Sequence, residues 1–386
     1  MTGAMYAAIS GLKAHMNKLN VIGNNIANVN TDGFKAGRAF FEDALYTTSK
    51  SGSNGSTVAG SINPSQIGYG VNVGSIDLDM SKGNYKPTGI DSDIYIDGEG
   101  FFMLGDKTTG DGIDPSNPES LKRFTLSRVG HLEWKADNYL TDGNGNVVYG
   151  FLCTGYDTAT QKYTFSDQLV PLHMPRQETV TVPADPNDPN STETTKIEIR
   201  YPTDGENHDQ KLTDARPENT DPTAGATEYP YVRIDTISVD RATGLITGVT
   251  KDSSDPIVIG YLALANVTNP NGLTHISGSY FQASAGAGDV TVCMMGNAGE
   301  GAGIQYVNGS LFGDANGGGA DTNPPELMRV GGNGSGQFIP GGLEQSKTDL
   351  ANEIAEMITT QRGYQANTRI ITVTDSMLEE LVNIKR

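Results

Sequence analysis

The 386-residue chain has few cysteines, few aromatic residues and no long apolar run. Its 2 cysteines, Cys153 and Cys293, exclude a disulfide-stapled scaffold, and they leave open one disulfide or two buried thiols. No apolar run approaches the roughly 18 residues of a membrane span. The beginning, MTGAMYAAISGLK, lacks the basic and apolar segments of a cleaved signal peptide. We therefore expect no membrane span, and we expect any export to use a route without a cleaved signal.

Positive charge is also scarce, because 27 basic residues face 46 acidic ones and the net charge is −19. Such a chain is repelled by nucleic acid and by anionic lipid, so neither is expected as a main partner. Aromatic residues make up only 7% of the chain, whereas glycine occurs 48 times. This balance favours short strands and many turns over a helical enzyme.

Motifs for catalysis and for cofactor binding are missing as well. The sequence contains no GxxxxGK[ST], no strand–GxGxxG–helix and no GxSxG pattern. The 5 histidines stand singly, at positions 15, 131, 173, 208 and 275. The DGNGN stretch from Asp142 resembles the start of a calcium loop, but Val147 and Cys153 occupy the places of the required Gly and Glu, so a hairpin turn is favoured. We predict no enzyme, no cofactor and no metal site.

Residues 4–28 are expected to form one helix with three different faces. Large apolar residues form a heptad seam, small residues form a second stripe from Ala4 to Ala14, and the third stripe is polar but almost uncharged. A surface helix normally has one apolar and one charged face, so this helix should pack on more than one side. The seam residues, predicted as an assembly interface, are Met5, Ile9, Leu12, Met16, Leu19 and Ile26.

The stretch from residue 343 to 384 repeats the heptad pattern. Its apolar seam, also predicted as an assembly interface, comprises Leu350, Ile354, Met357, Tyr364, Ile371, Leu378 and Val382. Gln361, Thr368 and Asp375 interrupt it with polar residues. Two interpretations remain: the two helices pack as a hairpin within one chain, or they assemble with other copies. Assembly is favoured because a hairpin leaves the small-residue stripe and much of the second helix without a partner.

β-rich sequence lies between the helices. Stretches from residue 69 and from residue 123 alternate and turn repeatedly, and Pro-, Asp- and Asn-rich segments follow after about residue 155. We predict a multidomain chain with a discontinuous α-helical terminal domain, whose helices form an inner coiled-coil layer, and two mainly-β domains. The helical domain is assigned to residues 1–30 with 343–386, the β-rich middle domain to 31–155 with 256–342, and an outer β insert to 156–255.

The stretch NNIANVNTDGF, from Asn24 to Phe34, closes the first helix with an unusual number of amides. Asparagine prefers caps and turns, because its side chain bonds neighbouring backbone groups. We expect Asn24, Asn25 and Asn28 to bond the helix end, and Gly33 to take a positive φ in the turn before an anchoring Phe34.

These residues carry a family resemblance. SGLKAHMNKLNVIGNNIANVNTDGFK resembles the N-terminal signature of the bacterial flagellar rod and hook family, and the stretch from Leu343 to Arg386 resembles its C-terminal counterpart. YGVNVGSIDLDMSKGNYKPTGIDSDIYIDGEGFFML is similar to the family's first β segment. Within the family, DLANEIAEMITTQRGYQANTRIIT looks like the hook branch rather than the distal rod.

The resemblance implies a structural subunit that polymerises into a curved, flexible tube around an export channel. Its terminal helices would line the tube, and the asparagine run would mark where the chain leaves it. The implied partners are other copies of the chain, the flagellar rod, hook-cap and hook–filament junction proteins, and the flagellar export apparatus. A distal rod protein, or a secreted β-rich binding protein with helical oligomerisation ends, remains as an alternative.

Overall fold

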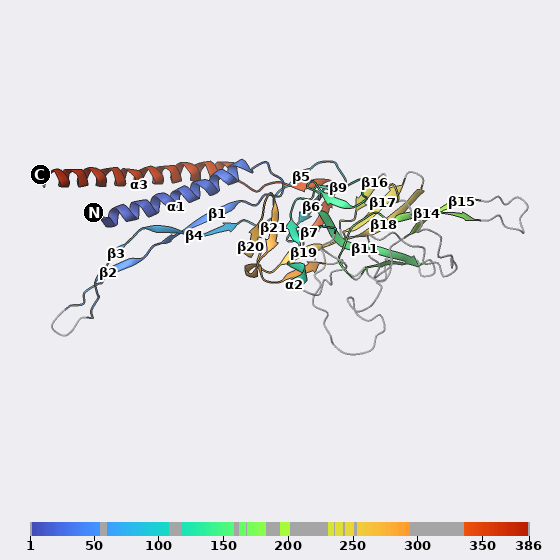
Figure 1. The fold of residues 1–386 in the computed structure, drawn as a ribbon, viewed down its shortest axis with the longest axis horizontal. Helices are drawn as coiled ribbons and strands as arrows, with labels where there is room; N and C mark the ends of the chain where they lie inside the picture. The colour runs from blue at the N-terminus through green and yellow to red at the C-terminus, as the bar shows by residue number, and fades with distance from the viewer. Residues whose placement is uncertain are drawn as a thin grey trace, which may run out of the picture. The chain divides into compact units, whose positions relative to one another are not determined.

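The computed structural model describes residues 2–54, 60–107, 118–157, 162–182, 194–200, 231–293 and 336–384, apart from residues 167, 235, 242–243 and 251–252. The chain divides into two compact units (Figure 1). One comprises residues 1–80 with 346–386, and the other residues 81–345. Helices at both ends and a largely β middle confirm the predicted classes of secondary structure.

The first unit combines two long helices with an extended β ribbon. Its elements are α1 (Thr2–Ala27), β1 (Gly37–Asp43), β2 (Tyr46–Lys50), β3 (Ser65–Gly68), β4 (Val71–Leu78) and α3 (Leu350–Ile384). Strand β1 pairs antiparallel with β4, and β2 pairs antiparallel with β3. Gly70, at φ +116°, lets the ribbon approach α1 closely, because a Cβ there would lie 1.9 Å from Ser10 Oγ.

The helix in the C-terminal stretch begins later than the sequence pattern indicates. Residues Gly342–Glu344 form a strand, and α3 starts only at Leu350. The reason is a cap: Asp349 Oδ1 accepts hydrogen bonds from the backbone N–H groups of Ala351 and Asn352 at 3.0 and 3.3 Å. The 35 residues of α3 span about 52 Å at 1.5 Å per residue.

The second unit is built almost entirely of strands. Its elements are β5 (Tyr85–Pro87), β6 (Ile94–Asp97), β7 (Phe101–Gly105), α2 (Pro118–Leu121), β8 (Thr125–Ser127), β9 (Leu132–Trp134), β10 (Leu140–Asp142), β11 (Val147–Asp157), β12 (Lys162–Phe165), β13 (Val170–Pro171), β14 (Arg176–Val182), β15 (Thr194–Arg200), β16 (Thr236–Val239), β17 (Leu245–Thr250), β18 (Ser253–Leu262), β19 (Leu264–Val267), β20 (Leu273–His275), β21 (Tyr280–Ala283), β22 (Val290–Cys293), β23 (Gln337–Pro340) and β24 (Gly342–Glu344), with short 3-10 turns at Pro270–Gly272 and Ala285–Ala287.

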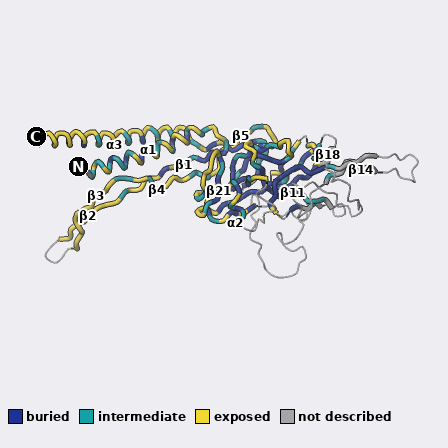
Figure 2. Tube along the Cα trace, in the orientation of Figure 1, coloured by how far each residue is buried: buried dark blue, intermediate teal, exposed yellow. Residues whose placement is uncertain are grey.

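A 14-stranded sheet organises this unit, with the order β16-β17-β18-β11-β7-β8-β21-β20 along its main path. The chain of this unit is largely buried in its central strands (Figure 2). One apolar cluster of the unit includes Phe102, Leu152, Leu262 and Phe338. The DGNGN stretch is the turn between β10 and β11, and the Asp142 side chain accepts the backbone N–H groups of Asn144 and Asn146.

Part of the predicted outer insert belongs to the same core. Leu172, Val239 and Ile246 pack in one cluster with Phe102 and Leu264. The hairpin of β14 and β15 is a separate two-stranded sheet, while residues 201–230 lie outside the described part of the chain. The three-part division of the chain, with a distinct domain over residues 156–255, stays a prediction.

Candidate assembly interface

Within the first unit, α1 packs antiparallel along α3 through its small residues. The closely packed positions of α1 are Ala8, Gly11, Ala14, Ile22 and Asn25, all of which are buried. A Cβ on Gly11 would lie 2.7 Å from the Asn367 side chain, and one on Gly363 of α3 would lie 2.7 Å from the His15 ring. The expectation that a hairpin leaves the small-residue stripe unexplained is therefore wrong, because that stripe is what lets the two helices approach.

Polar contacts fix the register of the helix pair. Lys18 Nζ lies 2.9 Å from Glu356 Oε2, and Asn25 Nδ2 donates to Glu353 Oε1 at 3.0 Å. Burial raises the pKa of the Glu353 carboxyl, and the bond from Asn25 opposes that shift. The exposed Lys18–Glu356 pair adds little stability by itself, so its main effect is on alignment.

Asn25 joins three elements although only 1% of it is exposed. Its Oδ1 accepts the backbone N–H of Gly37 at 2.9 Å, and its Nδ2 donates to the Gly37 carbonyl at 2.8 Å and to Glu353. The amide thus pairs with Gly37 as a neighbouring strand residue would, and holds the start of β1 against both helices. Among the residues of the asparagine run, this one makes the long-range contact.

The other residues of the run form a local turn after α1. Asn28 Nδ2 donates to the Asn24 carbonyl at 3.0 Å and to Asn24 Oδ1 at 3.1 Å, so these side chains bond the helix end. Gly33 has φ +70°, and Phe34 is buried. Positive φ is costly for residues with a Cβ, which accounts for glycine at this position.

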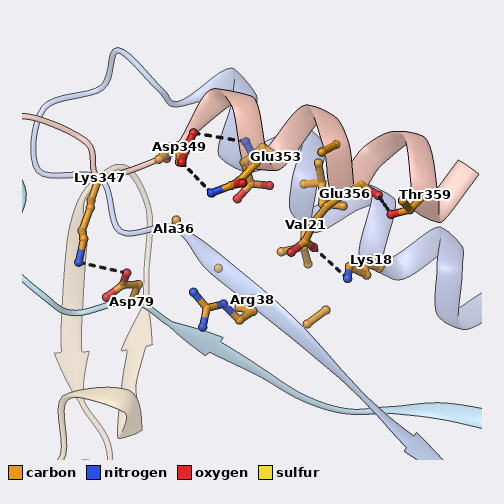
Figure 3. A pocket seen from close by; sticks show the side chains of 16 residues that line it. Lys18, Val21, Ala36, Arg38, Asp79, Lys347, Asp349, Glu353, Glu356 and Thr359 are labelled. Atoms are coloured by element: carbon orange, nitrogen blue, oxygen red, sulfur yellow. Dashed lines mark hydrogen bonds and ion pairs between the residues drawn. The ribbon is translucent and has the colours of Figure 1, made fainter.

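A cleft of about 580 Å³ lies where the C-terminal part of α1, β1 and the first turns of α3 meet (Figure 3). Arg38 points into it from β1, and Asp349 and Glu356 line it from the α3 side (Figure 3). Lys347 Nζ lies 3.7 Å from Asp79 Oδ2 at its edge. The lining carries charges of both signs, and the Lys18–Glu356 and Lys347–Asp79 pairs join some of them within the chain.

The predicted seam of α1 faces away from the most buried side of the helix. Met16 is exposed, and the other seam residues are half-buried: Met5, Ile9, Leu12, Leu19 and Ile26. The seam therefore keeps apolar surface that the described contacts of the unit do not fully cover. Its role as an interface with other copies stays a prediction.

The predicted seam of α3 divides into two groups. Met357, Tyr364 and Ile371 are half-buried, on the face that carries the buried Thr360 and Thr374. The remaining seam residues are exposed: Leu350, Ile354, Leu378 and Val382. The face of α3 that packs against α1 is thus turned slightly from the predicted seam. This face is also more polar than the seam, because threonine and asparagine side chains of α3 fit against the small residues of α1.

A second apolar stripe on α3 was missed by the sequence reasoning. Its members recur at a 3-4-4-3 spacing and are 44, 53, 51, 47 and 81% exposed: Ile370, Val373, Met377, Leu381 and Ile384. On a helix these positions lie on one side, roughly 90° from the side that carries Ile371 and Thr374. The same periodicity analysis, started one residue earlier, would have found the stripe.

The β ribbon of the first unit exposes apolar side chains as well. All residues of β2 and β3 are exposed. The exposed apolar residues of the ribbon include Phe40, Phe41, Leu45, Tyr46, Ile62, Ile67, Tyr69 and Ile76. An isolated two-stranded ribbon is marginally stable in water, so these residues are candidates for burial against another surface.

The described part of the chain offers few reactive or metal-binding side chains. Cys153 is a buried free thiol, and burial raises its pKa to about 12, so it is inert at neutral pH. The Cys293 side chain lies outside the described residues. Within the described ranges, no group of His, Cys, Asp and Glu is placed to hold a metal ion. No helix in these ranges combines the length and apolar character of a membrane span.

Two protein families match the chain at its ends. The family described as flagella basal body rod protein matches residues 5–35, which cover most of α1 and the asparagine turn. The family described as flagellar basal body rod FlgEFG protein C-terminal matches residues 339–384, which cover β24 and α3. Both ends of the chain are thus similar to flagellar rod and hook proteins. Such proteins are components of the bacterial flagellum, in its basal body and hook.

Individual proteins similar to this chain come from both the hook and the rod branch. It is 27% identical to the flagellar hook protein FlgE of Treponema pallidum, and 28% identical to the flagellar basal-body rod protein FlgG of Bacillus subtilis. Both alignments cover 100% of each chain. A segment covering 39% of the chain is 34% identical to FlgE of Helicobacter mustelae. At this similarity, hook and rod proteins match the chain equally well.

Proposed function

We propose that this protein is a structural subunit of the flagellar hook. Copies of the chain would polymerise into a curved, flexible tube that encloses the export channel and transmits torque between rod and filament. The observation that carries this proposal is the apolar stripe from Ile370 to Ile384, which remains exposed after α3 has packed on α1.

The stripe argues for contact with other copies of the same chain. Soluble monomers rarely leave a continuous apolar strip exposed along a helix, and such a strip normally marks an interface. Leu378 and Val382, beside the stripe, are also exposed, so the C-terminal part of α3 is apolar on more than one side. A helix of this kind needs neighbours on several sides, and a tube of helices in an inner coiled-coil layer supplies them.

The hook is preferred to the rod for two reasons. The stretch from Asp349 to Thr372 resembles the hook branch, and the β-rich unit of residues 81–345 is large. Outer β domains that slide over hydrated, polar contacts would let a tube bend while it rotates. The distal rod is the second candidate, because the alignment with the rod protein FlgG of Bacillus subtilis covers the full length of both chains, as the alignment with the hook protein FlgE of Treponema pallidum does.

The proposal extends to partners and to chemistry. As a hook subunit, the chain would contact the rod, the hook-cap protein and the hook–filament junction proteins, and it would leave the cell through the flagellar export apparatus. It would not be an enzyme. Both matching families are named for flagellar rod proteins, and their matched segments coincide with the two helical ends.

Electron microscopy of polymer grown from the purified protein tests this function. Curved tubes would support the hook, and straight, stiff tubes would favour the rod instead. The absence of tubes at all concentrations up to the solubility limit would contradict both candidates. The Val373→Asp variant described in the Discussion would then show whether the tubes depend on the α3 stripe.

A further inference from the structure

Two chain segments connect the β-rich unit to the helical unit. The unit boundaries fall between residues 80 and 81 and between residues 345 and 346. Directly inside the second boundary, β24 pairs antiparallel with β5, and Glu344 lies opposite Tyr85. Gln345 N–H also donates to the Asn84 carbonyl at 2.9 Å. The two connecting segments therefore leave the β-rich unit side by side, from the same end of one ladder.

Glu344 fastens this pair of segments. Its side chain is 2% exposed, and its Oε1 accepts the backbone N–H of Gly83 at 2.7 Å. A Cβ on Gly83 would lie 2.1 Å from the Gln345 carbonyl oxygen, so only glycine fits there. The Tyr95 hydroxyl donates to the Gly83 carbonyl at 2.8 Å. Both peptide groups at Gly83 are thus held by side chains of the β-rich unit.

Arg128 connects Glu344 to the next strands. Its side chain is also 2% exposed, and its Nη1 lies 3.7 Å from Glu344 Oε2. Nη1 donates to the Ile96 carbonyl at 3.3 Å, and Nη2 donates to the Gly98 carbonyl at 2.6 Å. These bonds reach β6 and the turn after it, and β6 in turn pairs with β23, which leads into β24. Arg128 itself follows β8, which belongs to the main sheet.

The direction of the strands decides what a pull would do. Force from the helical unit enters at residues 81 and 345, which lie at the same end of the β5–β24 ladder. Such force moves both strands together, so the hydrogen bonds between them are not the ones under strain. The strain falls instead on the contacts that hold the β5–β24 pair to the rest of the β-rich unit. The buried Arg128–Glu344 pair lies at the point where the force enters.

We propose that Arg128 and Glu344 form a mechanical anchor. Under load, this anchor would hold the paired strands β5 and β24, which lead to the two connecting segments, to the rest of the β-rich unit. A buried ion pair is weak evidence for equilibrium stability, because desolvation of the charges offsets their attraction. It does, however, give a short-range contact that must break before the ribbon can move. The biological meaning of the anchor, passage of torque from helices to outer domains, rests on the proposed function.

Pulling single full-length chains with optical tweezers tests the anchor. Cysteine handles at Gln361 in α3 and at the exposed Ala136, in a Cys153→Ser, Cys293→Ser background, load the packed helix pair, so that the force enters at residues 81 and 345 together. Handles at Ala136 and the exposed Ser277 send the force through the β-rich unit without passing Glu344. The variants are Glu344→Gln and the double variant Arg128→Met, Glu344→Gln, which stays foldable because no charge is left buried alone.

We expect both variants to unfold at least tenfold faster than the parent at fixed force through residue 345. With the second pair of handles, the rates should agree within about twofold. Lys82→Met is the matched control, because it removes a more exposed ion pair, between Lys82 in the connecting segment and Asp97 in β6, and should leave both rates unchanged. Equal acceleration in both pulling geometries would overturn the proposal and make the pair an ordinary core contact. Tube formation is scored separately, so that failure of the hook function and failure of the anchor are distinguishable.

Discussion

Replacing Val373 by aspartate should block polymerisation while leaving the monomer folded. Val373 lies within the exposed apolar stripe of α3 and is 53% exposed. Valine and aspartate have similar helix propensities, and no core contact is removed, so α3 should still form. In the polymer, however, the new carboxylate would take the place of an apolar contact.

The size of the effect follows from the exposure of the side chain. Full burial of a side chain of this kind contributes about 1.5–3 kcal/mol, and roughly half of it remains to be gained on assembly, or about 1 kcal/mol. A carboxylate buried without a partner costs several kcal/mol more. A total of about 4 kcal/mol per added subunit raises the critical concentration about a thousandfold, since 1.4 kcal/mol corresponds to a factor of ten.

The assay is sedimentation of polymer over a concentration series, together with circular dichroism of the soluble fraction. Ser376→Asp is the control, because it adds the same charge on the polar face of α3, beside Glu379 and Glu380, and Ser376 is exposed. The reasoning would be refuted if Val373→Asp assembled at the critical concentration of the parent, or if Ser376→Asp impaired assembly as strongly. Ile371→Asp is a less specific test, because Ile371 is half-buried on the side of α3 that packs within the chain.

Three further predictions concern a buried amide, the pH dependence of two histidines, and the outer segment of the β-rich unit. Asn25→Ala should lower the stability of the helical unit by about 3 kcal/mol, because it removes three hydrogen bonds and leaves both backbone polar groups of Gly37 without their partner. Asn24 is exposed, so Asn24→Ala should cost well under 1 kcal/mol. Hydrogen exchange in residues 5–27 measures both effects. Acidification from pH 7.5 to 5.5 should loosen the α1–α3 contact, because burial and then the charge of Lys18 lower the pKa of His15 below 6.5, so its contribution is full above pH 6.5 and is lost as the pH falls toward the folded-state pKa. The hydrogen bond to Asp93 raises the pKa of His131 instead, so that residue stabilises the β-rich unit fully below pH 6.5 and loses this effect as the pH rises through its folded-state pKa; His15→Gln and His131→Gln should each abolish one of the two opposite trends in hydrogen exchange. Replacing residues 178–229 by an Asn-Gly turn should leave the β-rich unit folded and able to assemble, because Arg176 and Tyr231 are already bridged and Val232 N–H bonds the Pro175 carbonyl at 2.9 Å; loss of the folded sheet by circular dichroism would count against a separable outer segment.

The sequence alone determined the classes of structure in this protein and where they occur. Heptad periodicity placed helices at both ends, because a helix that buries a face must repeat its apolar residues about every 3.5 positions. Alternation and turn residues placed strands between them. The same terminal residues carry the resemblance to flagellar rod and hook proteins, and the family matches at residues 5–35 and 339–384 agree with that interpretation.

Only the tertiary structure decided which faces meet within one chain. Periodicity shows that a face is buried but not against what, so the sequence pointed to the seams through Ile9 and Ile354 as interfaces and gave the small-residue stripe no partner in a hairpin. The stripe was chosen because small side chains at Gly11 and Gly363 let two helix backbones approach. The contact of Asn25 with Glu353 and the pairing of Arg128 with Glu344 were likewise beyond the sequence, because each depends on residues far apart in the chain that only the fold brings together.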